Sequence, residues 1–202
     1  MRLNKKERIL LYGSNLWYLG AGMLGPLFAV FTEQIGGDVL DISWAWATYL
    51  IIAGVLYIWV GKLTVKKYSK AKVMVWGYGL NALSTFSYLL VSEPWHLFFV
   101  QIGFGISAAL ATPTWNALYS EYENKKEDSY DWGLADGEAQ IITGLALIIG
   151  GFIITYFSFK VLFITMGIIQ IIATIYQARI LKSHLRDLNI SSKTSKTRIK
   201  RG

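Results

Sequence analysis

The sequence predicts an all-α integral membrane protein with six transmembrane helices, and three observations carry this prediction. The 202-residue chain is 53% hydrophobic and only 16% charged, which is far from the composition of a soluble domain. Its charged residues are confined to short clusters between long runs that contain no Asp, Glu, Lys or Arg. Each run is close to the roughly 20 residues that cross a hydrocarbon core about 30 Å thick. Because lipid cannot satisfy free backbone groups, such runs must be helical.

The charge-free runs give the expected helices in chain order. They lie at 9–32, 42–61, 73–92, 94–120, 139–159 and 161–178. The first run is too long for a cleaved signal peptide, contains a proline and has no small-residue cleavage site before the second run. We therefore expect a basic amino-terminal segment at 1–8, one membrane bundle over 9–182, and a basic, disordered tail at 183–202.

The lysines and arginines gather in alternate connections between the expected helices. They precede the first helix, lie between the second and third and between the fourth and fifth, and follow the sixth. The connections GGDVLD and SEPWH carry none, and the turn after the fifth helix carries only Lys160. By the positive-inside rule, this distribution predicts a multi-pass protein of the plasma (inner) membrane with both termini in the cytoplasm.

Two prolines lie at corresponding places within the expected helices. Pro26 and Pro113 each fall about three quarters of the way along the first and fourth helices, which run in opposite directions across the membrane. Matching interruptions of this kind predict helix breaks at both prolines and a 3+3 inverted repeat. The alternative is a coincidence, since prolines are common in membrane helices. Glycines in helices one, four and five favour close packing, whereas the branched, apolar sixth helix is expected on the outside of the bundle.

The number and spacing of these helices resemble the amino-terminal, six-helix half of the major facilitator superfamily, from about residue 10 to residue 181. The segment GKLTVKKYSK falls where that family carries a signature between its second and third helices. Its matching residues form the expected gating loop: Gly61, Leu63, Lys66 and Lys70. Val65 stands where the family has an acidic residue and Tyr68 where it has a glycine, so the resemblance implies a gate without the usual charged latch. From the residues alone, the favoured interpretation is that the lysines are topology signals that contact lipid headgroups.

The resemblance also implies a function. Members of the family typically have two six-helix bundles, with the substrate site between them at mid-membrane. A single bundle would then be a half-size secondary transporter that moves a small solute by alternating access. It would work as a homodimer with its site at the dimer interface near mid-membrane. The alternatives are a non-transporting membrane scaffold or a partner subunit of another half-transporter.

Polar side chains in helices one, four and five are the candidates for substrate contact. The expected substrate-binding residues are Asn15, Trp17, Tyr18, Gln101, Asn116 and Gln140. Glu33 and Glu138 are candidate coupling acids for a proton or a sodium ion, because carboxylates at membrane depth are commonly functional. Each residue has a structural alternative: amide side chains often join helices, and the acids lie near the ends of helices, where water solvates them.

The remaining features argue against other classes of protein. The acidic stretch at 121–136 matches no calcium loop, and we expect a solvated turn that pairs with the lysines of the basic segment, for example Lys66 with Glu121. Cysteine is absent, the two histidines lie at or beyond helix ends, and no H-E-x-x-H motif occurs. We therefore expect no enzyme, no cofactor and no metal site. The net charge of +7 is spread over short clusters, so no nucleic acid partner is expected.

Overall fold

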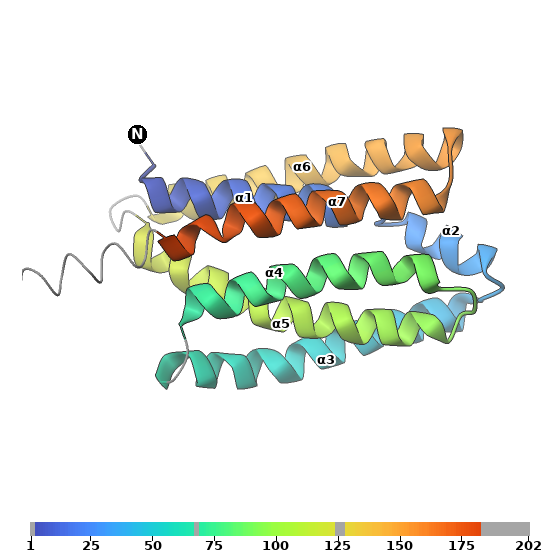
Figure 1. The fold of residues 1–202 in the computed structure, drawn as a ribbon, viewed down its shortest axis with the longest axis horizontal. Helices are drawn as coiled ribbons and strands as arrows, with labels where there is room; N and C mark the ends of the chain where they lie inside the picture. Colours follow the sequence, from blue (N-terminus) through green and yellow to red (C-terminus); the bar gives the residue numbers. More distant parts are fainter. Residues whose placement is uncertain (1–2, 67–68, 124–127, 183–202) are drawn as a thin grey trace, which may run out of the picture.

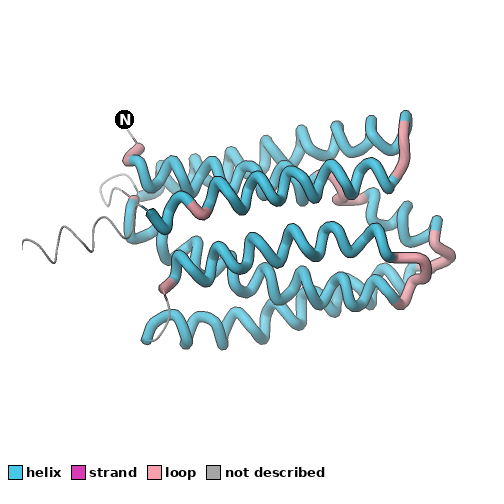
Figure 2. Tube along the Cα trace, in the orientation of Figure 1, coloured by secondary structure: helices cyan, strands magenta, loops and turns pink. Residues whose placement is uncertain are grey.

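The computed structural model describes residues 3–66, 69–123 and 128–182, which form a bundle of helices (Figures 1 and 2). In chain order these are α1 Lys5–Gly22, α2 Leu27–Gln34, α3 Val39–Lys66, α4 Lys70–Ser87, the 3-10 turn η1 Tyr88–Leu90, α5 His96–Tyr122, α6 Asp128–Tyr156 and α7 Phe159–Gln177. The starts of α1, α4 and α6 and the ends of α3, α5 and α7 lie at one end of the bundle, here called the basic end (Figure 1). The opposite end, which holds α2, is called the far end.

Four of the described helices are long and apolar enough to cross a membrane, namely α3, α5, α6 and α7. The prediction of an all-helical membrane protein is thereby confirmed, but the number of spans is four by this measure instead of six. The two helices that fall short have identifiable reasons. α1 starts with four charged residues and ends at Gly22, and α4 carries two lysines near its start and several polar residues along its length.

The two prolines lie in different backbone settings, one at a helix break and one within a helix, so the expectation of matching helix breaks is corrected. The expected first helix is divided between α1 and α2, with Pro26 capping the start of α2. Gly25 just before it has a φ of +28°, a value that residues with a Cβ rarely adopt. Pro113, by contrast, lies inside a continuous α5. The hydroxyl of Thr114 donates to the carbonyl oxygen of Ala111 at 2.9 Å, one of the local bonds that accompany a proline within a membrane helix.

The fifth expected helix begins earlier than its charge-free run. α6 starts at Asp128 instead of residue 139, so most of the acidic stretch expected to be a solvated turn is helical. Asp128 and Asp131 lie in its first turn, where negative charge is favourable because it faces the positive end of the helix dipole. The hydropathy pattern marks where a helix can enter lipid, and a helix can extend beyond that limit.

The helices pack as two groups of three. α1 packs between α6 and α7, α5 packs between α3 and α4, and the groups meet mainly where α4 packs against α7 (Figure 1). The expected position of the sixth helix on the outside is therefore wrong, because α7 contacts both α1 and α4. Its Gln170 and Gln177 are fully buried, and α1 has glycines opposite them. A Cβ added to Gly20 would lie 2.6 Å from Nε2 of Gln170.

Candidate functional site

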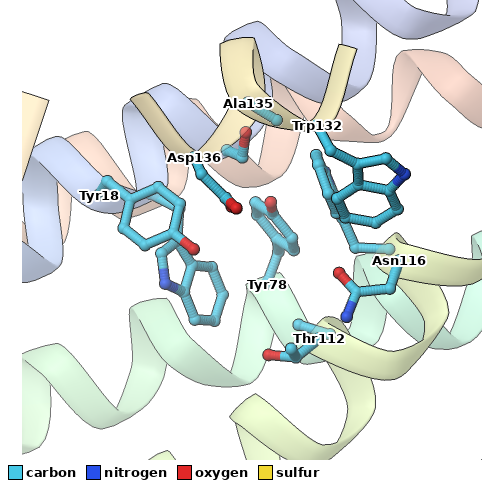
Figure 3. Close-up of a pocket in the computed structure, with 11 residues that line it drawn as sticks. Tyr18, Tyr78, Thr112, Asn116, Trp132, Ala135 and Asp136 are labelled. Atoms are coloured by element: carbon cyan, nitrogen blue, oxygen red, sulfur yellow. The ribbon is translucent and has the colours of Figure 1, made fainter. Parts of the chain in front are cut away.

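Two hollows lie between the two groups of helices. The inner hollow, toward the basic end, has a volume of about 520 Å³ including open space, and the outer hollow, toward the far end, about 730 Å³. The inner hollow is lined by α1, α4, α5 and α6 at Ser14, Trp17, Tyr18, Tyr78, Ala111, Thr112, Trp115, Asn116, Trp132, Ala135 and Asp136 (Figure 3). Helix ends and turns contribute little to this wall, so the site stands on rigid elements.

Trp17 belongs to the walls of both hollows. Its ring meets Tyr78 of α4 edge-on, with 4.6 Å between the ring centroids and 61° between the planes. This aromatic pair therefore lies where the inner and outer hollows adjoin. Gln170 of α7 donates from Nε2 to the carbonyl oxygen of Trp17 at 3.0 Å, and this hydrogen bond holds the backbone of α1 at Trp17 against α7.

Further hydrogen bonds hold the wall of the inner hollow in register. Trp115 of α5 donates from Nε1 to the carbonyl oxygen of Leu10 in α1 at 3.2 Å. Near the basic end, the hydroxyl of Tyr119 donates to the carbonyl oxygen of Asp131 in α6 at 2.7 Å. These bonds join α5 to the second turn of α1 and to the first turn of α6, the helix that carries Trp132 and Asp136.

The outer hollow carries neutral polar groups on α4 and α5. Gln101 donates from Nε2 to the hydroxyl of Tyr88 at 3.4 Å, and the Ser107 hydroxyl donates to Oδ1 of Asn81 at the same distance. Nδ2 of Asn81 is buried without a hydrogen-bond partner among the described residues. Because an unpaired buried donor is costly, this amide is available to a ligand oxygen or a water molecule.

The structure brings four of the six expected substrate-binding residues to the hollows. Trp17, Tyr18 and Asn116 line the inner hollow, and Trp17 and Gln101 line the outer hollow. Gln140 is exposed on α6 and lines neither hollow. Asn15 lies instead beside an apolar groove between α1 and α6.

Asn15 and the candidate coupling acid Glu138 form a pair across the α1–α6 contact. Nδ2 of Asn15 donates to Oε2 of Glu138 at 2.6 Å, while Oδ1 of Asn15 is buried without a hydrogen-bond partner among the described residues. Glu138 was expected near the inner rim of its span, but it lies ten residues into α6, because α6 begins at Asp128. The pair therefore joins two helices at a half-buried position.

Two other sets of expected residues lie outside the hollows. Glu33 is exposed near the end of α2. Of the expected gating loop, Gly61 and Leu63 belong to the last turns of α3, and Lys70 begins α4. Lys66 closes α3, but its side chain, like Val65 and Tyr68, lies outside the described residues.

The expected pairing between the basic segment and the acidic stretch is present through a different lysine. Nζ of Lys70 forms an ion pair with Oε1 of Glu121, which lies in the last turn of α5. The contact ties the start of α4 to the end of α5 at the basic end. Both side chains are partly exposed, at 30% and 46%.

Sequence reasoning missed several residues of the inner hollow, above all Asp136. Because it belongs to a run of six acids, it was assigned to a solvated turn. The available signal was helical spacing, since Trp132 and Asp136 stand four residues apart and so share one face of a helix. Tyr78 was missed because the expected third helix has no charge or proline to mark a functional face.

The fold is that of a multi-helix membrane protein, with two hollows enclosed among apolar helices. The sequence profile of the Major Facilitator Superfamily matches residues 10–199, and the chain belongs to that superfamily. An uncharacterized MFS-type transporter of Methanocaldococcus jannaschii is 26% identical over 157 residues, which cover 78% of this chain. The matched region is 40% of that relative, so this chain matches less than half of the relative's length. The family resemblance expected from the sequence is thereby confirmed.

Proposed function

We propose that this protein moves a small solute across the membrane by alternating access, with the inner and outer hollows as the two faces of one solute path. One observation carries the proposal: two hollows, each with polar side chains in a mostly apolar wall, adjoin at Trp17 within otherwise apolar helices. Solute sites near mid-membrane at a helix interface are the common arrangement in secondary transporters. We further propose that the hollow toward the basic end faces the cytoplasm of the inner membrane, as the distribution of lysines and arginines indicates.

The helix contacts support an inverted repeat of α1–α4 and α5–α7. In such a repeat, α1 corresponds to α5, α3 to α6 and α4 to α7. Under this correspondence, the contact of α1 with α6 matches that of α5 with α3, and the contact of α1 with α7 matches that of α5 with α4. The contact between α4 and α7 is unchanged by this correspondence. We propose on this basis that α1 with α2, and α4, also cross the membrane, which gives six spans in a 3+3 arrangement.

The open side of the inner hollow requires a cover. Thr112, Asn116 and Asp136 are exposed on it, and polar and charged groups at membrane depth do not face lipid without cost. Helices α3 and α6 each carry a row of glycines with open space beside it, here called a glycine stripe, which would let another helix approach. A Cβ at any of these positions would meet no atom within 4 Å: Gly54 and Gly61 of α3, and Gly137, Gly144 and Gly151 of α6. Within each stripe the glycines recur at seven-residue steps, about two helical turns, so they share a face.

We propose that a second copy of the chain supplies this cover as a two-fold homodimer. Because α3 and α6 are exchanged by the repeat, the stripe on α3 of one copy would pack against the stripe on α6 of the other, twice over. Close approach of small residues is the usual basis of helix association in lipid. This places the solute path between the two copies near mid-membrane.

Glu138 remains the better of the two candidate coupling acids. It holds Asn15 across the α1–α6 contact, so gain of a proton or sodium ion there would alter how these helices pack. Glu33 is exposed near the end of α2, at the far end of the bundle. Coupling to either ion is part of the proposal.

Flux measurements test the transport proposal. The whole chain is reconstituted in liposomes and exposed to a panel of labelled amines, amino acids, sugars, carboxylates and nucleosides, with and without proton and sodium gradients. We expect uptake of one solute class above that of empty liposomes, and a large loss in a Trp17→Ala variant that still elutes as the wild type does. Absence of flux for every class from a stable, folded dimer would favour the alternative role, a membrane scaffold that docks through its glycine stripes.

A further inference from the structure

Five of the eleven residues that line the inner hollow are aromatic, and they come from four helices. Trp17 and Tyr18 come from α1, Tyr78 from α4, Trp115 from α5 and Trp132 from α6. Trp115 and Trp132 meet edge-on with 6.3 Å between ring centroids, as Trp17 and Tyr78 do at 4.6 Å. The face of an aromatic ring carries partial negative charge, so a space with several rings in its wall attracts cations and disfavours anions.

Among the described residues that line this wall, Asp136 is the one carboxylate. It stands on α6 one turn after Trp132, and its side chain points into the space beside Tyr18 and Tyr78 (Figure 3). No Lys, Arg or His belongs to the described lining of the inner hollow. Within the described part of the chain, the Asp136 side chain has neither a hydrogen bond nor an ion pair.

Asp136 is exposed on the open side of the hollow, and a carboxylate at membrane depth favours the approach of a positive charge. The surrounding wall offers few other polar groups, mainly the side chains of Ser14, Thr112 and Asn116 and the tyrosine hydroxyls. A strongly hydrated inorganic ion needs a full shell of oxygen ligands. An organic cation instead presents methyl or methylene groups to ring faces and a single charge to the carboxylate.

We propose that the inner hollow binds a monovalent organic cation, an amine or a quaternary ammonium compound, whose charge lies between Asp136 and the rings of Trp17, Tyr18 and Trp132. The inference rests on the proposed function, since it names the solute class of the same hollow. Asp136 supplies the charge selection, and the rings supply the apolar enclosure. The Tyr18 side chain is 41% exposed, so its ring is not covered by its own chain.

Binding is measured on the whole chain in lipid nanodiscs by isothermal titration calorimetry. The ligands are choline, tetraethylammonium and benzyltrimethylammonium, with 3,3-dimethylbutan-1-ol as the neutral counterpart of choline. We expect at least one of the cations to bind and the neutral alcohol to bind about tenfold more weakly than choline or not at all. Failure of all three cations to bind, or binding of the alcohol as tight as that of choline, would overturn the proposal.

Variants then locate the bound charge. Asp136→Asn keeps the shape of the side chain and removes its charge, and we expect it to weaken cation binding about tenfold or more. Asp128→Asn, on the same helix but exposed outside the hollow, is the matched control and should bind as the wild type does. Tyr18→Phe should retain binding, whereas Tyr18→Leu should weaken it because the ring is lost. Equal affinity of the wild type and Asp136→Asn would contradict the assignment.

The result separates this inference from the transport proposal. Cations that bind through Asp136 but do not cross liposome membranes would leave the cation site standing and contradict transport of that class. Flux of another solute class, with no cation binding and no competition by cations, would contradict the cation site and leave transport standing.

Discussion

At the scale of single residues, glycines set how closely the helices approach. Gly150 of α6 lies against the end of α1, and a Cβ there would lie 2.1 Å from the carbonyl oxygen of Met23. Met23 directly precedes the break between α1 and α2, so the obstacle is backbone, which cannot rotate away as a side chain would. On the same helix, Gly133 has open space at the corresponding point.

The first prediction compares these two glycines. Gly150→Ala should lower the free energy of unfolding by about 1–3 kcal/mol, because the added methyl group must displace the α1–α2 connection. Gly133→Ala should be neutral or stabilising, since alanine favours a helix more than glycine does. Thermal unfolding of the detergent-solubilised protein measures both. A Gly150→Ala variant as stable as Gly133→Ala would show that α1 and α6 do not pack as described.

Residue identity also explains which of the predicted substrate-binding residues line a hollow. Trp17, Tyr18, Asn116 and Gln101 stood out because polar or amphipathic side chains interrupt charge-free runs, and the structure places each in the wall of a hollow. Asp136 did not stand out, because one acid among six carries no individual signal. Which acid lines a hollow depends on the rotation of α6, and that rotation is set by contacts with α1.

At the scale of helices, hydropathy located the apolar segments well but their ends and breaks poorly. α6 begins eleven residues before its charge-free run, since the run starts at residue 139 and the helix at residue 128. The two prolines looked equivalent, yet only the one at 26 follows a glycine with positive φ. The burial of α7 was missed because a uniformly apolar helix carries no periodic signal that distinguishes a lipid face from a packed face.

The ion pair between Lys70 and Glu121 gives a prediction about the basic end. Lys70→Glu places two like charges at the contact between α4 and α5, and Glu121→Lys does the same with the opposite sign. Either change should lower stability by about 0.5–1 kcal/mol, since the pair is partly exposed and screened. The double reversal should recover most of that loss.

A double-mutant cycle of thermal unfolding at low and high salt measures this coupling. The recovered stability should shrink as the salt concentration rises, because salt screens exposed charges. If the loss of stability in the double variant equals the sum of the losses in the two single variants, the two charges do not interact. The Lys72→Glu variant, exposed two residues along α4, is the control for a change of net charge alone.

At the scale of the whole molecule, the proposed dimer follows from the open side of the inner hollow and the two glycine stripes. The chain contains no cysteine, so introduced cysteines report without background. We expect a protein carrying both Gly54→Cys and Gly144→Cys to form a disulfide-linked dimer in native membranes on mild oxidation. Each single variant should crosslink weakly, because the proposed contact joins α3 of one copy to α6 of the other.

The control places the second cysteine on a buried face. Gly54→Cys combined with Gly167→Cys should not crosslink, because Gly167 of α7 is packed against the ring of Phe86. Monomers from the Gly54→Cys and Gly144→Cys pair, with both cysteines still reactive toward a small maleimide, would contradict the homodimer. The transport proposal would then require a different bundle as the cover.

Alternating access itself is tested most directly by labelling single cysteines from each side of the membrane. Asn116→Cys reports on the inner hollow and Ala21→Cys on the outer hollow, since these residues line one hollow each. We predict that a membrane-impermeant maleimide reaches the first variant from the side of the basic end and the second from the opposite side. A transported solute should change the two labelling rates in opposite directions. Labelling of both variants from the same side, or rates that rise and fall together with solute, would contradict alternating access.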